Sequence, residues 1–139
     1  MMPLSHLMWA LPAALLYFLI TQEVYSSFAF LLTAVFIDID HVLDYILAYG
    51  KFDIKYFLRG RWFKKKLYVI FHSYELVLIL LFVYFQTNNS LVLAIALGIT
   101  YHFITDMVYY KSELKKKILF YSLIYRMSQK FEKKVFCSG

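Results

Sequence analysis

The sequence predicts an all-α protein, an integral membrane bundle of four transmembrane helices with a basic amphipathic C-terminal segment. Three observations predict this fold. Of the 139 residues, 62% are hydrophobic and 21% aromatic, whereas a soluble domain is usually about 45–50% apolar. Four apolar stretches approach the ~20 residues that cross a bilayer. All fifteen Lys and Arg residues fall in two blocks, 51–66 and 111–134, at the ends of these stretches.

The first two stretches predict the first two spans. The first runs from about Leu4 to Ile20 and contains Pro12, which membrane helices tolerate. It lacks the positive region and the small-residue cleavage site of a signal peptide, so we expect a helix. The second runs from about Ser26 to Tyr49, and we expect one helix over this range. The connection between them, 21–25, carries no Lys or Arg.

The third and fourth stretches, Leu67–Phe85 and Leu91–Tyr110, predict the other two spans. The connection between them also lacks Lys and Arg, so both basic blocks belong to one side of the membrane. The positive-inside rule places that side in the cytoplasm. We therefore expect an inner-membrane protein with both termini cytoplasmic, a four-helix transmembrane domain over 1–110 and a basic cytoplasmic tail over 111–139.

The tail contains one apolar run, Ile118–Tyr125, which is too short to span a bilayer. Basic residues on both sides predict a helix lying on the inner surface and attracted to anionic lipids; a disordered basic tail is the alternative. No soluble domain remains to present the basic residues to a nucleic acid, so we expect none to bind. Four helices form a thin bundle, for which a homodimer is plausible.

Ionisable side chains lie inside all four apolar stretches, where they are costly and usually mark function. All four histidines of the chain and five of its nine acidic residues belong to this set. Helical spacing puts the polar residues of each stretch on one face. In the expected topology they also share one level, within roughly 6–15 Å of the inner surface. The set comprises His6, Asp38, Asp40, His41, Asp44, His72, Glu75, His102 and Asp106.

This composition predicts a metal site. Mixed imidazole and carboxylate ligands suit Zn²⁺, Mn²⁺ or Fe²⁺. Several carboxylates could not stay ionised together in a membrane without a cation, so we expect one or two divalent ions, with zinc favoured. The only cysteine, Cys137, excludes a C-x-x-C motif. The expected ligands are His6, Asp40, His41, Asp44, His72, His102 and Asp106.

Four further residues are expected to act with the metal. A bound metal lowers the pKa of water and so favours hydrolysis. Glu75 is the candidate general base, and Asp38 is a further ligand or catalytic carboxylate. Arg59 and Arg61 lie in the first basic block and could hold a phosphate group at the mouth of the site.

Two other interpretations remain open. The polar residues could form a buried hydrogen-bond network that holds the helices together, or a path for protons or metal ions. The network explains poorly why the set is almost entirely Asp, Glu and His, with no Lys or Arg inside the apolar stretches. The Ser-Gly-His of phosphatidic-acid phosphatases and the Asp-Gly of CDP-alcohol phosphatidyltransferases are absent, so those two enzyme classes are excluded.

The order of four short motifs resembles small inner-membrane proteins of the YdjM-like family, which are described as metal-dependent hydrolases. That family carries an early His, an Asp-x-Asp-His, an Arg-Gly, a Thr-His-Ser-type element and a late His-x-x-x-Asp. The last element also looks like part of zinc-dependent phospholipase C, which suggests a phospholipid or other phosphoester substrate. The resemblance covers about residues 5–106 and implies a metal-dependent hydrolase. The matching residues are His6, Asp38-Ile39-Asp40-His41, Arg59-Gly60, His72-Ser73 and His102-x-x-x-Asp106.

Overall fold

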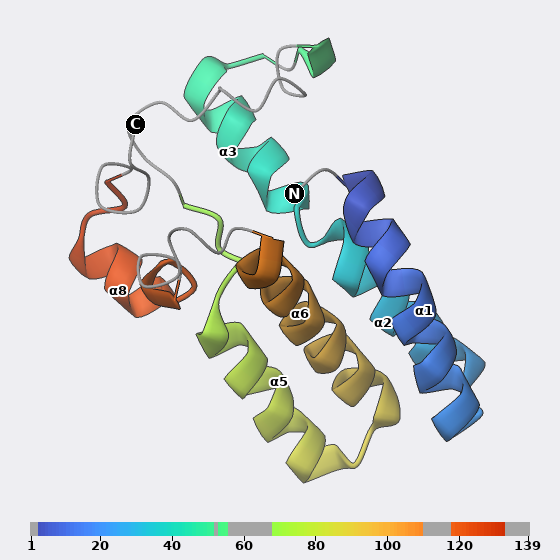
Figure 1. Ribbon diagram of the computed structural model, residues 1–139. Coiled ribbons are helices and arrows are strands. Elements are labelled where there is room, and N and C mark those ends of the chain that lie inside the picture. The colour runs from blue at the N-terminus through green and yellow to red at the C-terminus, as the bar shows by residue number, and fades with distance from the viewer. Residues whose placement is uncertain (1–2, 52, 56–67, 110–117, 133–139) are drawn as a thin grey trace.

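The computed structural model describes residues 3–51, 53–55, 68–109 and 118–132. Within these residues the structure is all-helical and has no strand, which confirms the expected all-α class for this part of the chain (Figure 1). The helices are α1 (Pro3–Thr21), α2 (Val24–Phe36), α3 (Ile39–Tyr49), α5 (Tyr74–Thr87), α6 (Ser90–Tyr109) and α8 (Leu123–Ser128).

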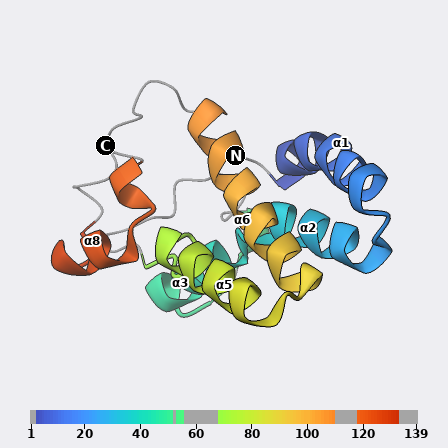
Figure 2. The same cartoon turned by 90° about the horizontal axis from the view of Figure 1, so that it is seen from below.

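Four of these helices form a bundle around α6, which contacts α1, α2 and α5. The α1–α2 and α5–α6 connections lie together at one end, which we call the apolar end (Figures 1 and 2). The starts of α1 and α5 and the ends of α2 and α6 meet at the other end, which we call the site end. The chain therefore brings residues from its two halves together at the site end.

Small residues let α2 and α6 approach closely. The buried core between α1, α2 and α6 consists of Ala10, Ala14, Phe30, Ala34, Val35 and Ala94. At Gly98 an added Cβ would lie 2.1 Å from Thr33 Oγ1 and 2.6 Å from the Phe30 carbonyl oxygen, so only glycine fits there. Close approach at small residues is the usual means of joining helices in a membrane.

The outer faces of the bundle are strongly apolar. Among the described residues, α6 is the one helix long and apolar enough to cross a membrane, and α1 and α5 are shorter apolar helices. The helix α5 buries none of its side chains, and large apolar residues such as Ile20 and Phe85 are 74% and 72% exposed. Large exposed apolar surfaces usually mark contact with a membrane, another protein or a ligand.

The expected second span, Ser26–Tyr49, is wrong as a single helix. The chain bends at Ile37 and Asp38 between α2 and α3 (Figure 1). The amides of Asp40 and His41 donate to carbonyls three residues back, at 3.5 and 3.0 Å, which is the tighter spacing of a 3₁₀ turn. Asp38 thus lies at a helix junction, where its carboxylate can meet groups from several helices.

The third expected span also begins later than its apolar stretch. Residues 68–73 form a non-helical loop, and α5 starts at Tyr74. Ser73 caps the helix, because its hydroxyl accepts the Leu76 amide at 3.3 Å. Val69 in this loop has φ +33°, a conformation that costs energy for a β-branched residue. The loop must therefore be held by contacts with other parts of the chain.

The C-terminal segment, residues 118–132, packs against the bundle. The apolar run Ile118–Tyr125, for which the sequence predicts part of a surface helix, is not one continuous helix: the chain makes a short helical turn, leaves it at Tyr121 and starts α8 at Leu123. Ser122 causes the restart, because its hydroxyl accepts the Tyr125 amide at 3.2 Å. Tyr121 and Arg126 are 3% and 0% exposed, so this segment is part of the folded structure.

Candidate metal centre

Histidines and aspartates from several elements converge at the site end. His6 comes from α1, Asp38 from the α2–α3 junction, His72 from the loop before α5, and His102 with Asp106 from α6. Figure 1 shows why they meet, since these elements begin or end at the same end of the bundle. We call the following residues the His/Asp cluster: His6, Asp38, His41, His72, His102 and Asp106.

The Asp38 carboxylate is the centre of the cluster. Its Oδ1 lies 3.2 Å from His72 Nε2, 3.3 Å from His41 Nε2 and 3.4 Å from His102 Nε2. Its Oδ2 lies 3.8 Å from His6 Nε2. Ligand atoms at 2.0–2.1 Å from a tetrahedral zinc ion are about 3.3 Å apart. These distances fit two ligands of one cation, and they are also those of a histidine paired with a carboxylate.

Asp106 supplies the second carboxylate of the cluster. Its Oδ1 lies 3.3 Å from His6 Nε2, and its Oδ2 lies 3.7 Å from His102 Nε2. The Tyr121 hydroxyl donates to Oδ2 at 3.1 Å. Burial and the negative charge of Asp106 raise the pKa of Tyr121, so the phenol stays protonated and orients this carboxylate.

The Nδ1 atoms of two histidines already have acceptors. His102 Nδ1 lies 2.9 Å from the Ala34 carbonyl oxygen, and a carbonyl can only accept. His72 Nδ1 lies 3.0 Å from Asp40 Oδ2, which also accepts the Phe71 amide at 3.0 Å. Both rings therefore carry a proton on Nδ1. His72 Nε2 also bonds a carboxylate oxygen, Asp38 Oδ1 at 3.2 Å, so a metal bound there would take the place of the Nε2 proton of this ring.

His6 follows the same rule through Thr105. The Thr105 hydroxyl donates its one proton to the His102 carbonyl oxygen at 2.8 Å, so it must accept from His6 Nδ1, which lies 3.3 Å away. His6 and His102 stack with ring centroids 4.0 Å apart, and two charged rings would repel at this distance. His6 Nε2 and His102 Nε2 are buried without a hydrogen-bond partner. Unpartnered lone pairs beside two carboxylates are what a cation would satisfy.

The cluster is closed on one side and accessible on the other. His6, His72 and His102 are at most 1% exposed, whereas the side chains of Asp38 and His41 are 16% and 22% exposed. Three overlapping sets of ligand atoms within 4.8 Å could hold a metal ion: His6–Asp38–His102, Asp38–His41–His72 and His72–His102–Asp106. Because the sets share residues, they form one site with donors for one or two ions.

Two predicted ligands, Asp40 and Asp44, act on the loop 68–73 that carries His72. Asp44 Oδ2 accepts the amides of Tyr68 and Val69 at 2.8 and 3.2 Å. Asp40 Oδ2 accepts the amide of Phe71 and also bonds His72 Nδ1, which orients the His72 ring. The structure thus places both carboxylates behind the ligand atoms, where they fix the backbone and the ring.

Arg126 also holds the loop 68–73, through its carbonyl groups. The sequence did not indicate this role. Its guanidinium donates to the carbonyl oxygens of Tyr68, Val69 and His72 at 2.8, 2.7 and 2.8 Å. Burial lowers its pKa and the nearby carboxylates of Asp40, Glu75 and Asp44 raise it; an arginine stays charged under such opposing effects. In the sequence this residue is indistinguishable from the other cations of the basic tail.

Glu75, the expected general base, is not brought into the cluster. Its carboxylate accepts the Ser122 hydroxyl at 2.8 Å and the amides of Leu123 and Ile124 at 2.9 and 3.1 Å. It therefore binds the N-terminus of α8, where a carboxylate stabilises a helix. Its catalytic role stays a prediction that these contacts do not favour. Arg59 and Arg61 lie outside the described residues, and their phosphate-binding role also stays a prediction.

The residues that sequence reasoning missed are those that hold the ligands, namely Thr105, Tyr121 and Arg126. Ser122 before Leu-Ile-Tyr-Arg is a helix-start signal that could have indicated α8. No local signal indicates that a tail tyrosine reaches Asp106. No protein-family model, curated protein or solved structure matches this chain. The function must therefore be argued from the site itself.

Proposed function

We propose that the protein is a membrane-embedded, metal-dependent hydrolase that acts on a membrane-associated phosphoester, such as a phospholipid. The observation that carries the proposal is the set of buried imidazoles whose Nδ1 atoms are all engaged. Their Nε2 atoms face Asp38 and Asp106. This is the arrangement of histidine ligands with hydrogen-bonded rear nitrogens around a divalent metal.

The proposed location is the inner membrane, with four spans and both termini in the cytoplasm. The exposed apolar faces of α1, α5 and α6 support an environment of lipid. The second span is then made of α2 with the start of α3, and the site end faces the cytoplasm because both basic blocks lie on that side in the sequence. The site would sit just below the anionic headgroups.

Zinc is the proposed metal, since neutral imidazoles and carboxylates are its common ligands, and Mn²⁺ and Fe²⁺ use the same atoms. His6, His72, His102, Asp38 and Asp106 would hold it. When bound, the ion would supply polarisation of the phosphoester and a lowered pKa for water. His41, on the accessible side with Nε2 at 3.3 Å from Asp38 Oδ1, would be the further histidine ligand where a second ion binds with Asp38 and His72.

The rival function is translocation of metal ions or protons. A path across the membrane needs polar groups along the whole bundle. In the described residues, the core next to the cluster is formed by Ala10, Ala14, Phe30 and Ala94, none of which can bind an ion, and the buried Ser26 and Ser27 lie beyond it at the other end. This apolar layer favours a site that opens to one side over a path through the bundle.

The experiment is metal analysis combined with a lipid assay. Purified protein would be stripped with a chelator, reloaded with Zn²⁺, and assayed on phospholipids in mixed micelles. We expect at least one zinc per chain and turnover in the wild type, and less than a tenth of both in His102→Ala. Glu23→Gln is the matched control, because that carboxylate bonds Ser26 at the apolar end, and it should retain both.

The outcomes separate the three interpretations. A wild type that takes up no metal after reloading would overturn the proposal and leave the buried polar network. Stoichiometric metal with no phosphoester turnover, but with ion flux into liposomes, would establish translocation instead.

A further inference from the structure

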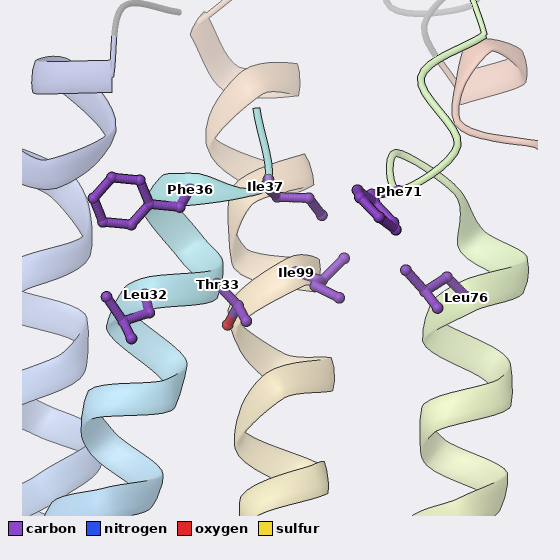
Figure 3. Close-up of a pocket in the computed structure, with 7 residues that line it drawn as sticks. All are labelled: Leu32, Thr33, Phe36, Ile37, Phe71, Leu76 and Ile99. Carbon is purple, nitrogen blue, oxygen red and sulfur yellow. The ribbon is translucent and has the colours of Figure 1, made fainter. Parts of the chain in front are cut away.

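An apolar pocket lies beside the His/Asp cluster, between α2 and α5 and over α6 (Figure 3). Its volume is about 290 Å³, near the lower end of small-molecule pockets. Ile37 and Ile99 are buried, and Leu32, Phe36 and Phe71 are 39%, 61% and 41% exposed, so the pocket opens on the outer face of the bundle. It is lined by Leu32, Thr33, Phe36, Ile37, Phe71, Leu76 and Ile99.

The lining residues lead directly into the metal-binding residues. Ile37 precedes Asp38 and Phe71 precedes His72 in the chain. Ile99 lies three residues before His102 in α6, which is one turn on the same helix face, or about 4.5 Å along the axis. Three separate elements therefore pass from a wall of the pocket to a residue of the cluster within one helical turn.

The pocket can bind only an apolar group. Thr33 is its one polar lining residue, and the Thr33 hydroxyl donates within its own helix, to the carbonyl oxygens of Ala29 and Phe30 at 2.8 and 3.1 Å. A polar ligand would lose its hydrogen bonds to water there without replacement. A molecule that fills the pocket and also reaches the cluster must have a hydrocarbon part joined to a metal-binding head.

We propose that this pocket binds a hydrocarbon chain of the substrate while the phosphoester head lies at the His/Asp cluster. The inference rests on the proposed hydrolase and specifies its substrate class, an amphiphile whose chain enters from the membrane between α2 and α5. The bend at Ile37–Asp38 fits this proposal, because the last pocket residue from this part of the chain, Ile37, is followed directly by the central carboxylate of Asp38.

The probes that test it are n-alkylphosphonates from methyl to hexyl, whose head binds metal and whose chain is too short to form micelles. Binding to the zinc-loaded protein would be measured by calorimetry. Moving a methylene from water into an apolar site contributes ~0.8 kcal/mol, so we expect affinity to rise by up to about fourfold per methylene. Leu76→Trp and, independently, Leu32→Trp should remove most of this increase and leave methylphosphonate affinity and zinc content unchanged.

Leu16→Trp is the matched control, because Leu16 is 59% exposed on α1, away from the pocket. This variant should keep the wild-type increase in affinity per methylene. Partition of the alkyl chains into detergent would affect all the variants equally, so it cannot produce a difference between them. An equal increase in wild type, Leu76→Trp and Leu32→Trp would overturn the pocket and leave the hydrolase proposal intact. Failure of zinc-loaded wild type to bind methylphosphonate would instead overturn the proposed function and this inference with it.

Discussion

The core of the bundle and its site end are built by different interactions. In the core, α1, α2 and α6 pack through alanines, a buried phenylalanine and the close contact at Gly98. At the site end, the loop 68–73 is held by side chains distant in sequence, chiefly Asp40, Asp44 and Arg126. The core gains stability from close packing and the site end from charge-assisted hydrogen bonds. Variants in the two regions should therefore have different effects.

The largest expected effect is that of Arg126→Ala. The change removes the guanidinium donor of three carbonyl groups, of which only that of Val69 keeps another donor within the described residues, the His72 amide at 3.1 Å, and hydrogen bonds to charged groups contribute ~1.5–3 kcal/mol each. We expect at least ~3 kcal/mol lower stability and loss of zinc binding, measured by thermal unfolding and metal analysis. Arg126→Lys should recover only part, since lysine lacks the fork that spans several acceptors. Normal zinc affinity in Arg126→Ala would show that the loop holds His72 without it.

Gly98→Ala tests the core. The added methyl group would overlap Thr33 Oγ1 and the Phe30 carbonyl, so α2 and α6 must separate, at a cost of typically ~1–3 kcal/mol. The melting temperature should fall while zinc still binds one to one at the folded site. If zinc binding weakens in step with stability, the separation has reached the Ala34 carbonyl that accepts from His102 Nδ1, and the core and the site end are not independent.

Asp40→Asn should sharpen the contrast, because it weakens the site with little effect on the fold. The asparagine keeps the size of the side chain but removes the charge behind His72 Nδ1. Loss of such a supporting carboxylate typically lowers metal affinity 10–100-fold. Competition with a chromophoric chelator would measure the affinity, and a melting temperature within a few degrees of wild type is the accompanying expectation.

Glu75→Gln should have the smallest effect. It weakens the bonds to the start of α8 by about 1 kcal/mol, the usual contribution of a helix cap. Because the Glu75 carboxylate bonds the start of α8 and not the His/Asp cluster, turnover should remain within about threefold of wild type. A loss of turnover by orders of magnitude with zinc retained would restore Glu75 as the general base.

The same contrast separates what the sequence could and could not predict. The helices of the bundle follow from apolar stretches and short connections, and the sequence placed His6, His102 and Asp106 near one level. The bend at Ile37–Asp38 and the non-helical loop before Tyr74 interrupt equally apolar stretches. There, long-range acceptors and donors outweigh helix propensity, and a single sequence does not reveal such partners.

The contacts of Arg126 also set an order of events during synthesis. Every side chain of the His/Asp cluster is made by residue 106, but Tyr121 and Arg126, which fix Asp106 and the loop carrying His72, leave the ribosome later. A nascent chain therefore carries all of its metal donors before it can hold them in place. The site is completed by residues that follow the cluster in the chain, so a chain that stopped between residues 106 and 121 would carry every ligand and yet lack a finished centre.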